Sequence, residues 1–197
     1  MAEHFNIFNR FITQFVEMND AELEDFNRKC EKVHFSKGQI IIKSGERQEN
    51  LYFIIKGIVR NYIETESGET KIYNFRCENM QVTGYALYNY PSDLKALLSV
   101  ECLEDCIMIK VPLAVINYVK EHFKNGERLG RQMAEAHVLE LVNYVIDRDT
   151  MSIMDRYDNL ENFFPNIHQR VPQHMIASYL CITPVHLSNI KKSRKVS

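Results

Sequence analysis

Long apolar runs are missing from this chain of 197 residues. The longest, such as the three isoleucines at 40–42, fall far short of the roughly 20 residues that a membrane-spanning helix needs. Residues 1–10 carry charges and asparagines where a secretory signal would need an apolar stretch. We therefore expect a soluble, cytoplasmic protein that has no membrane as a partner.

The chain has few cysteines, and none of them has the spacing of a typical cysteine pair. The five are odd in number and include no C-x-x-C motif, so we expect reduced thiols rather than disulfides or a zinc site. The β-rich middle of the chain holds one histidine, His34, whereas a metal-dependent enzyme of the cupin type would need a cluster such as H-x-H. No serine lies in a G-x-S-x-G motif. These absences predict no catalytic residue, no metal and no cofactor, and they argue against an enzyme.

Acidic residues are missing altogether from 165–197. This segment has five Lys or Arg residues and three histidines, whereas residues 1–164 carry 19 basic and 26 acidic side chains. The formal charge is therefore +5 in the segment and −7 before it. Such an asymmetry favours contact with a polyanion, and nucleic acid is the obvious one. The alternative is a basic tail that is simply solvated.

Glycine is also scarce, and four of the seven glycines mark turns. Gly38, Gly45, Gly57 and Gly68 fall between short β-branched and aromatic segments, at corners where a positive φ is often required. These segments recur about every ten residues between 33 and 111, a spacing that indicates an antiparallel sandwich or barrel. The predicted strands are 39–42, 51–55, 58–63, 71–75, 82–85, 97–102 and 107–111.

Helical periodicity frames this β-rich region on both sides. Apolar residues at 8, 11, 12, 15 and 16 indicate a short amphipathic helix, and Asn19 with Glu22 has the capping-box spacing that begins a second. Pro112 suits the first position of a helix that extends through 119. Further helices are expected over 127–147 and 151–164.

The helix predicted over 127–147 has an apolar stripe wider than one core face requires. Two interpretations stay open: the stripe is buried against the β-rich region, or it pairs with the stripe of a second copy in a coiled-coil-like dimer. The predicted dimer seam is Ala134, Val138, Leu141 and Val145, with Leu139, Val142 and Ile146 beside it.

Within the acid-free segment, residues 173–192 have the pattern of two short helices joined by a tight turn. Pro172 begins the first helix, and Thr183 and Pro184 suit the N-cap and first position of the second. Cys181 takes a turn position that is usually glycine because the backbone there is often left-handed, and a Cβ there costs about 1 kcal/mol. Short polar side chains at the front of the second helix suit base edges, and basic ones behind suit phosphates. The predicted DNA contacts are Gln173, His174, Thr183, Pro184, Val185, His186, Ser188, Asn189, Lys191, Lys192 and Arg194.

Three segments carry a further signal: K-G-Q-I-I-I-K-S-G-E and L-Y-F-I-I-K-G-I-V-R in the β region, and V-P-Q-H-M-I-A-S-Y-L-C-I-T-P-V-H-L-S-N-I near the C-terminus. Together with the long helix between them, they resemble the Crp–Fnr family of bacterial transcription regulators over nearly the whole chain. The resemblance implies a homodimer that joins along the central helices and presents two recognition helices to a palindromic site on double-stranded DNA. It also implies RNA polymerase as a partner and a small-molecule effector, of unknown identity, in the β-roll.

The chain departs from the cyclic-nucleotide-binding members of that family at both ligand positions. Those members carry a Gly-Glu pair, which holds the ribose hydroxyl, and an Arg on a nearby strand, which holds the phosphate; here Gly84-Tyr85 and Ala96 stand at these positions. Lys95 is next to Ala96, but adjacent strand residues point to opposite faces. We therefore expect that neither cyclic AMP nor cyclic GMP binds.

The predicted fold class is α+β, with three parts. They are an N-terminal double-stranded β-helix or jelly-roll sensor domain (1–125), a central dimerisation helix (126–150) and a small helix-turn-helix domain of the winged-helix type (151–197). The predicted function is a dimeric DNA-binding transcription regulator whose effector pocket includes Gly84, Tyr85 and Ala96. The alternative is a sensor or interaction module with a tail that no longer binds DNA.

Overall fold

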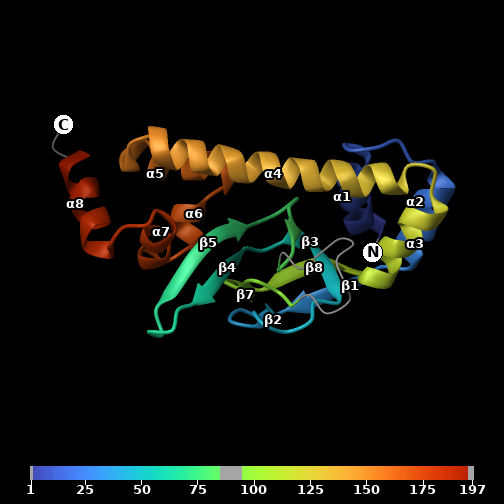
Figure 1. The fold of residues 1–197 in the computed structure, drawn as a ribbon, viewed down its shortest axis with the longest axis horizontal. Helices are drawn as coiled ribbons and strands as arrows, with labels where there is room; N and C mark the ends of the chain where they lie inside the picture. The colour runs from blue at the N-terminus through green and yellow to red at the C-terminus, as the bar shows by residue number, and fades with distance from the viewer. Residues whose placement is uncertain (1, 85–94, 195–197) are drawn as a thin grey trace.

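The computed structural model describes residues 2–84 and 95–194, which form an elongated molecule with a β-roll at its centre (Figure 1). The described strands are β1 (Glu31–Phe35), β2 (Ile40–Ile42), β3 (Asn50–Lys56), β4 (Val59–Glu64), β5 (Thr70–Arg76), β6 (Gln81–Val82), β7 (Ser99–Cys102) and β8 (Cys106–Pro112). The described helices are α1 (Ala2–Thr13), α2 (Asp20–Arg28), α3 (Leu113–His122), α4 (Gly126–Thr150), α5 (Ile153–Phe163), α6 (Ile167–Arg170), α7 (Gln173–Tyr179) and α8 (Pro184–Arg194).

The roll consists of two four-stranded antiparallel sheets packed face to face. One has the strand order β1-β8-β3-β6 and the other β2-β7-β4-β5. Tyr52 and Ile54 of β3 point into the space between the sheets, whereas Leu51 and Phe53 point outward against α1 and α2. Because the middle of β3 is buried on both faces, residues 51–55 are apolar or aromatic without alternation, between Asn50 and Lys56 at the ends of the strand.

Glycine corners shape the roll as the sequence predicts. Gly38, Gly45, Gly57 and Gly68 all have positive φ. At Gly57, where φ is 117°, an added Cβ would clash with the Sγ of Cys106. Both the backbone conformation and the close approach of β8 therefore require glycine at this corner.

The N-terminal helices cover the outer face of the β1-β8-β3-β6 sheet. Asn19 caps α2 through the predicted capping box: its Oδ1 accepts from the backbone N–H of Glu22 at 2.9 Å, and the Glu22 carboxylate accepts from the Asn19 N–H at 3.1 Å. Phe8 packs between Phe26 and Phe53, with ring centroids 5.5 and 5.3 Å away. Burying each of these rings stabilises the fold by roughly 1.5–3 kcal/mol.

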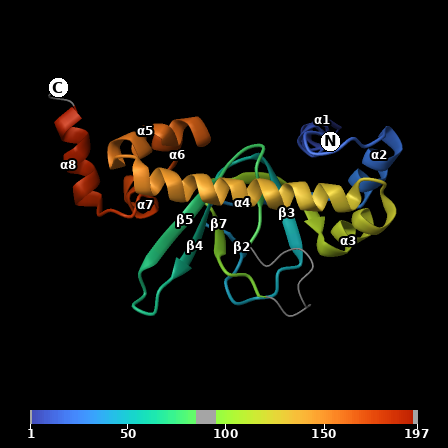
Figure 2. The same ribbon diagram turned by 45° about the horizontal axis from the view of Figure 1, so that its top comes forward.

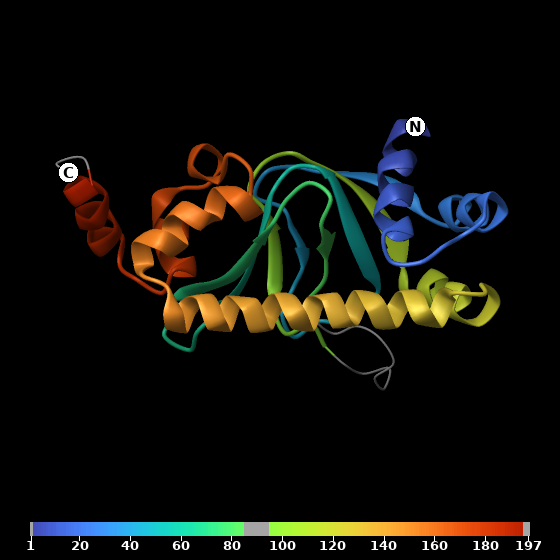
Figure 3. The ribbon, with the colours of Figure 1, turned by 90° about the horizontal axis from the view of Figure 1, so that it is seen from above.

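The long helix α4 runs along the roll from the N-terminal helices to the C-terminal ones (Figures 2 and 3). Polar contacts from Arg76 and Gln81 fasten α4 to the roll. Arg76 of β5 donates to Glu140 at 2.6 Å, and Gln81 of β6 bonds the His137 ring at 2.8 Å. Burial and the adjacent Arg76 charge lower the pKa of His137, so its ring is neutral near pH 7. None of the helices described over 2–84 and 95–194 is long and apolar enough to cross a membrane.

The C-terminal helices cover the outer face of the second sheet. One apolar cluster joins Ile58 and Phe75 of the roll to Leu160 of α5, Phe164, and Ile176 of α7. The C-terminal helices therefore share a hydrophobic core with the roll in this structure.

The structure differs from the sequence predictions at several boundaries. Strand β1 was not predicted, because its largely half-exposed side chains give it no clear alternation. Pro112 is the N-cap residue of α3 rather than its first helical residue. Val16 is buried but lies beyond the end of α1. Between 151 and 194 the described backbone is helical or irregular with no strand, so the winged-helix type is not supported there.

Candidate nucleic-acid interface and roll pocket

Helices α7 and α8 are joined by the tight turn that the sequence predicts. Cys181 has a φ of 61°, in the left-handed region. Its side chain is exposed, and the next residue, Ile182, donates its N–H to the carbonyl of Ala177 at 3.0 Å. The turn therefore uses a left-handed residue that carries a Cβ, where glycine would be less strained.

Helix α8 begins where Thr183 and Pro184 predict. The Thr183 hydroxyl accepts the N–H of His186 at 3.1 Å, and Pro184 is the first helical residue. Leu187 is 1% exposed and packs with Ile176 and Leu180, so it fixes which face of α8 turns inward.

The opposite face of α8 lies in solvent. Val185 is 69% exposed, so its aliphatic side chain lies on this surface. The predicted DNA contacts that are exposed are Thr183, Pro184, Val185, His186, Ser188, Asn189 and Lys192. The structure thus brings most of the predicted residues onto one surface; the side chain of Arg194 lies outside the described part of the chain.

Lys191 does not join this surface. Its Nζ donates to the Oε1 of Gln173 at 3.0 Å and lies 5.5 Å from the centre of the Tyr157 ring. These contacts tie α8 back to α7 and α5. The side chain of the predicted contact Gln173 therefore bonds Lys191 of the same chain, whereas the neighbouring His174 is exposed.

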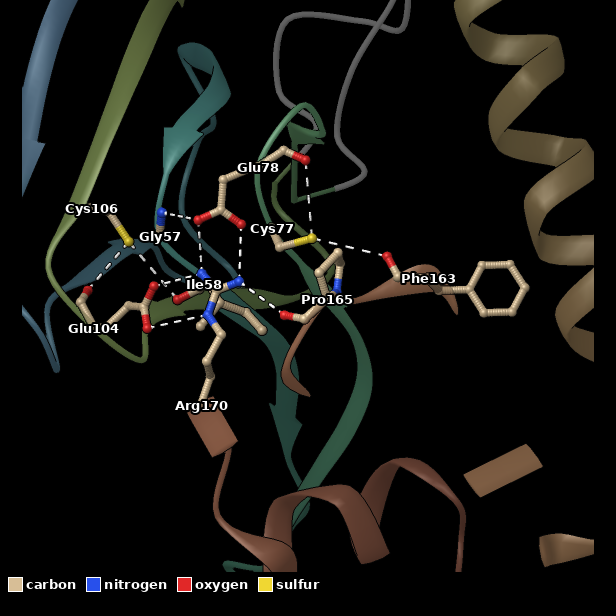
Figure 4. A network of polar contacts seen from close by, with 9 residues as sticks. All are labelled: Gly57, Ile58, Cys77, Glu78, Glu104, Cys106, Phe163, Pro165 and Arg170. Atoms are coloured by element: carbon tan, nitrogen blue, oxygen red, sulfur yellow. Dashed lines mark hydrogen bonds and ion pairs between the residues drawn. The ribbon is translucent and has the colours of Figure 1, made fainter. Parts of the chain in front are cut away.

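Arg170 accounts for part of the basic charge of the tail, and the structure pairs it internally (Figure 4). Its guanidinium donates to Glu78 at 2.8 and 2.9 Å and to Glu104 at 2.6 and 3.4 Å. Burial opposes the charge of Arg170, but the hydrogen bonds to Glu104 and Glu78 outweigh burial and raise its pKa. The partners of Arg170 lie 92 and 66 residues away in the sequence, so no local sequence pattern could predict these pairs.

Glu78 is also bonded to the roll itself. Its Oε1 accepts the N–H of Gly57 at 2.8 Å (Figure 4). Burial alone would raise the pKa of Glu78, but the hydrogen bonds from Arg170 and Gly57 lower it below its ordinary value. The two carboxylates hold Arg170, at the end of α6, against two turns of the roll; we name Arg170, Glu78 and Glu104 the arginine clasp.

A second contact fastens α7 to the edge of the roll. The Ser178 hydroxyl accepts the N–H of Ile72 at 3.2 Å and donates to the carbonyl of Thr70 at 3.4 Å. These backbone groups belong to β5, the last strand of its sheet. Together with the arginine clasp, this contact sets where α7 and α8 lie relative to the roll.

In the roll, the predicted pocket residues Gly84 and Ala96 meet. Both are buried, and the carbonyl of Gly84 accepts the N–H of Leu97 at 2.8 Å. Ala96 is buried and Lys95 is exposed, but neither lies in a described strand, because β7 begins only at Ser99. Tyr85 lies outside the described residues.

The side chain of Gln48, which sequence reasoning missed, lies beside Gly84. Its Oε1 accepts the Gly84 N–H at 2.8 Å, and its Nε2 donates to the carbonyl of Asn50 at 2.9 Å. A Cβ on Gly84 would lie 2.8 Å from that of Ala96 and 2.9 Å from Gln48 Oε1. Gly84, Ala96 and Gln48 are thus uncharged and closely packed, and we refer to them as the lining of the predicted pocket.

The predicted dimer seam lies on the outward side of α4. Val138 and Leu141 are 61% and 62% exposed, and Val145 is 37% exposed. Ala134 is exposed as well. Of the two interpretations left open by the sequence, burial of this stripe against the roll is therefore wrong.

Comparison with known proteins gives a match for the central part of the chain. Residues 32–123, which run from β1 to the end of α3, match the family described as the cyclic nucleotide-binding domain. No curated protein sequence matches the chain significantly.

Solved structures resemble the chain over most of its length. A regulator of the Crp/Fnr family from Eubacterium rectale has a TM-score of 0.69 at 12% identity, covering 91% of this chain and 84% of its own. The c-di-GMP-responsive global regulator CLP of Xanthomonas campestris has a TM-score of 0.67 at 11% identity, covering 90% and 92%. FixK2 from Bradyrhizobium japonicum has a TM-score of 0.65 at 17% identity, covering 85% of each chain. At these identities the likeness shows a shared fold.

Proposed function

Residues 32–123 form a domain of the cyclic nucleotide-binding family within a Crp–Fnr-like fold, and from this premise we propose that the chain is a dimeric DNA-binding transcription regulator. The observation that carries the proposal is helix α8. Its inner face is buried through Leu187, whereas its outer face is exposed and lies in a segment without a single acidic residue.

The dimensions of α8 suit a major groove. Eleven residues make a helix about 16 Å long, and the major groove of B-DNA is about 12 Å wide and admits one helix. Thr183 and Pro184 give α8 an N-terminus that faces solvent, and the N-terminal residues of a recognition helix are those that read bases. Lys192, two turns further on, is placed to neutralise a phosphate.

Dimerisation through α4 would bury the exposed stripe of Ala134, Val138, Leu141 and Val145. Burying an aliphatic side chain contributes roughly 1.5–3 kcal/mol, and a two-fold seam buries each residue twice. The same symmetry would present two copies of α8 to half-sites about one helical turn of DNA apart.

The roll would sense an effector other than a cyclic nucleotide. The lining at Gly84, Ala96 and Gln48 offers no positive charge, and a phosphate that enters a partly buried site needs a charged partner.

A sensor module without DNA binding is the second candidate, and one observation favours it. The arginine clasp and the Ser178 contact hold α7 on the roll, so α8 is not presented by an independent domain. A gel-shift assay of the full chain against genomic fragments separates the two functions. The regulator predicts retarded fragments that survive competitor DNA, and the sensor module predicts none.

A further inference from the structure

The exposed face of α8 has an unusual composition for a helix that reads DNA. Residues 183–192 include no arginine and no acid. Val185 and Asn189 are four residues apart and therefore lie on one face, with Ser188 beside them and Lys192 one turn further. All four side chains are exposed.

Base recognition in the major groove depends on a small set of pairings. Arg or Lys pairs with the two acceptors of guanine, and Asp or Glu accepts from cytosine, but neither kind of side chain occurs at 184–190. Asn pairs with adenine through two hydrogen bonds, and an apolar side chain contacts the methyl group of thymine. Ser188 can bond several bases, and the neutral ring of a histidine such as His186 carries one donor and one acceptor on its two nitrogens.

The orientation of this face is fixed by contacts on the other side of α8. Leu187 is buried, and Lys191 is tied to Gln173 at 3.0 Å, so α8 cannot rotate without breaking both. Val185, at 69% exposure, takes part in neither contact and lies in the first turn of the helix, where base edges are read.

We propose that α8 reads A·T base pairs: Val185 contacts a thymine methyl group and Asn189 pairs with an adenine in each half-site. This inference rests on the proposed function, since it requires that α8 enters DNA. Lys192 contributes affinity through a phosphate and carries no base preference.

The test begins with duplexes selected by the full chain from a random pool. In the selected half-site, each thymine is replaced in turn by deoxyuridine, which lacks the methyl group, and each adenine by 7-deazaadenine, which lacks N7. We expect one thymine whose replacement weakens binding roughly fourfold, the value of one buried methyl-sized group. One adenine replacement should weaken binding, because the second bond to Asn189 can no longer form.

Variants assign these effects to residues. In Val185→Ala, the deoxyuridine substitution should have no further effect. In Asn189→Ala, discrimination against the wrong base at the adenine position should fall by about 5- to 150-fold. Lys192→Ala is the matched control on the same face and should weaken all duplexes alike. Circular dichroism and melting temperature of each variant check that the fold is retained.

The outcomes distinguish the reading of A·T pairs by α8 from DNA binding by the chain. Half-sites that are selected for G·C pairs, or a methyl effect that persists in Val185→Ala, overturn the base-reading proposal while leaving DNA binding intact. Absence of binding to any duplex at low salt overturns the proposed function and this inference with it.

Discussion

The guanidinium of Arg170 and the carboxylate of Glu78 face each other in a two-pronged ion pair, with N–O distances of 2.8 and 2.9 Å. The residues lie 92 positions apart, one at the end of α6 and the other in a turn of the roll. Glu104 completes the arginine clasp from a second turn. The pair therefore joins the C-terminal helices to the roll without using the hydrophobic core.

Removing the guanidinium should destabilise the protein. In Arg170→Met, both carboxylates are left without their partner, and hydrogen bonds to charged groups are worth roughly 1.5–3 kcal/mol each before partial exposure reduces them. We expect a lower denaturant midpoint for Arg170→Met than for the wild type. The midpoint of Arg170→Lys should lie between them, because lysine keeps the positive charge but lacks the planar guanidinium that bonds two carboxylate oxygens at once. An unchanged midpoint in Arg170→Met would show that the clasp contributes nothing to stability.

Glu78 should make the protein lose stability as the pH falls in the acidic range. Its pKa is lower in the folded protein than its ordinary value of 4.5, so the unfolded chain binds the proton more readily. Its stabilising contribution is complete above pH 4.5 and is lost as the pH falls through the lower folded-state value. Urea unfolding of Glu78→Gln from pH 7 to 3 should therefore show a shallower loss of stability than the wild type. Parallel pH profiles would contradict this assignment.

A charge in the dimer seam should separate the subunits. Leu141→Asp places one carboxylate from each copy in the proposed seam of apolar side chains. Sedimentation should show a shift toward monomer with the β-sheet signal in circular dichroism retained. Asn143→Asp is the control, because residue 143 is exposed and lies on the opposite side of α4 from residue 141. A wild-type chain that sediments as a monomer at tens of micromolar would rule out the constitutive dimer.

Cyclic nucleotides should not bind to the roll. Titration calorimetry of the full chain with cyclic AMP and with cyclic GMP is expected to give no saturable heat, because the lining at Gly84, Ala96 and Gln48 holds no cation. A dissociation constant in the micromolar range for either nucleotide would mean that another part of the roll supplies the phosphate partner.

Local chemistry made the ends of several elements predictable. The Asn19 and Glu22 capping box, the Thr183 cap and the left-handed turn at Cys181 each depend on residues a few positions apart, and each is present in the structure. The overall roll was predictable too, because turn glycines and short strands recur at regular spacing.

Tertiary contacts explain what the sequence did not predict. Gln48 and Gly84 are 36 residues apart, and nothing in the local pattern of Gln48 indicates that its amide fills the space beside that glycine. Arg170 and Lys191 both count toward the basic tail, yet the fold turns them toward protein partners. The number of basic residues in the C-terminal segment is therefore larger than the number that α8 and its neighbours expose at their surface.

The central claim is that the C-terminal segment binds DNA, and the most direct measurement is the salt dependence of that binding. The full chain is titrated against a duplex selected from genomic fragments, at several salt concentrations, by fluorescence anisotropy. We expect that log affinity falls linearly with log salt, and that replacing Lys192 and Arg194 together by Ala weakens binding to every sequence. Removing one lysine or arginine that neutralises a phosphate should flatten the slope by roughly 0.9. Binding that stays equally tight and equally salt-sensitive in this double variant, or no binding by the wild type at low salt, would contradict DNA binding by the C-terminal segment.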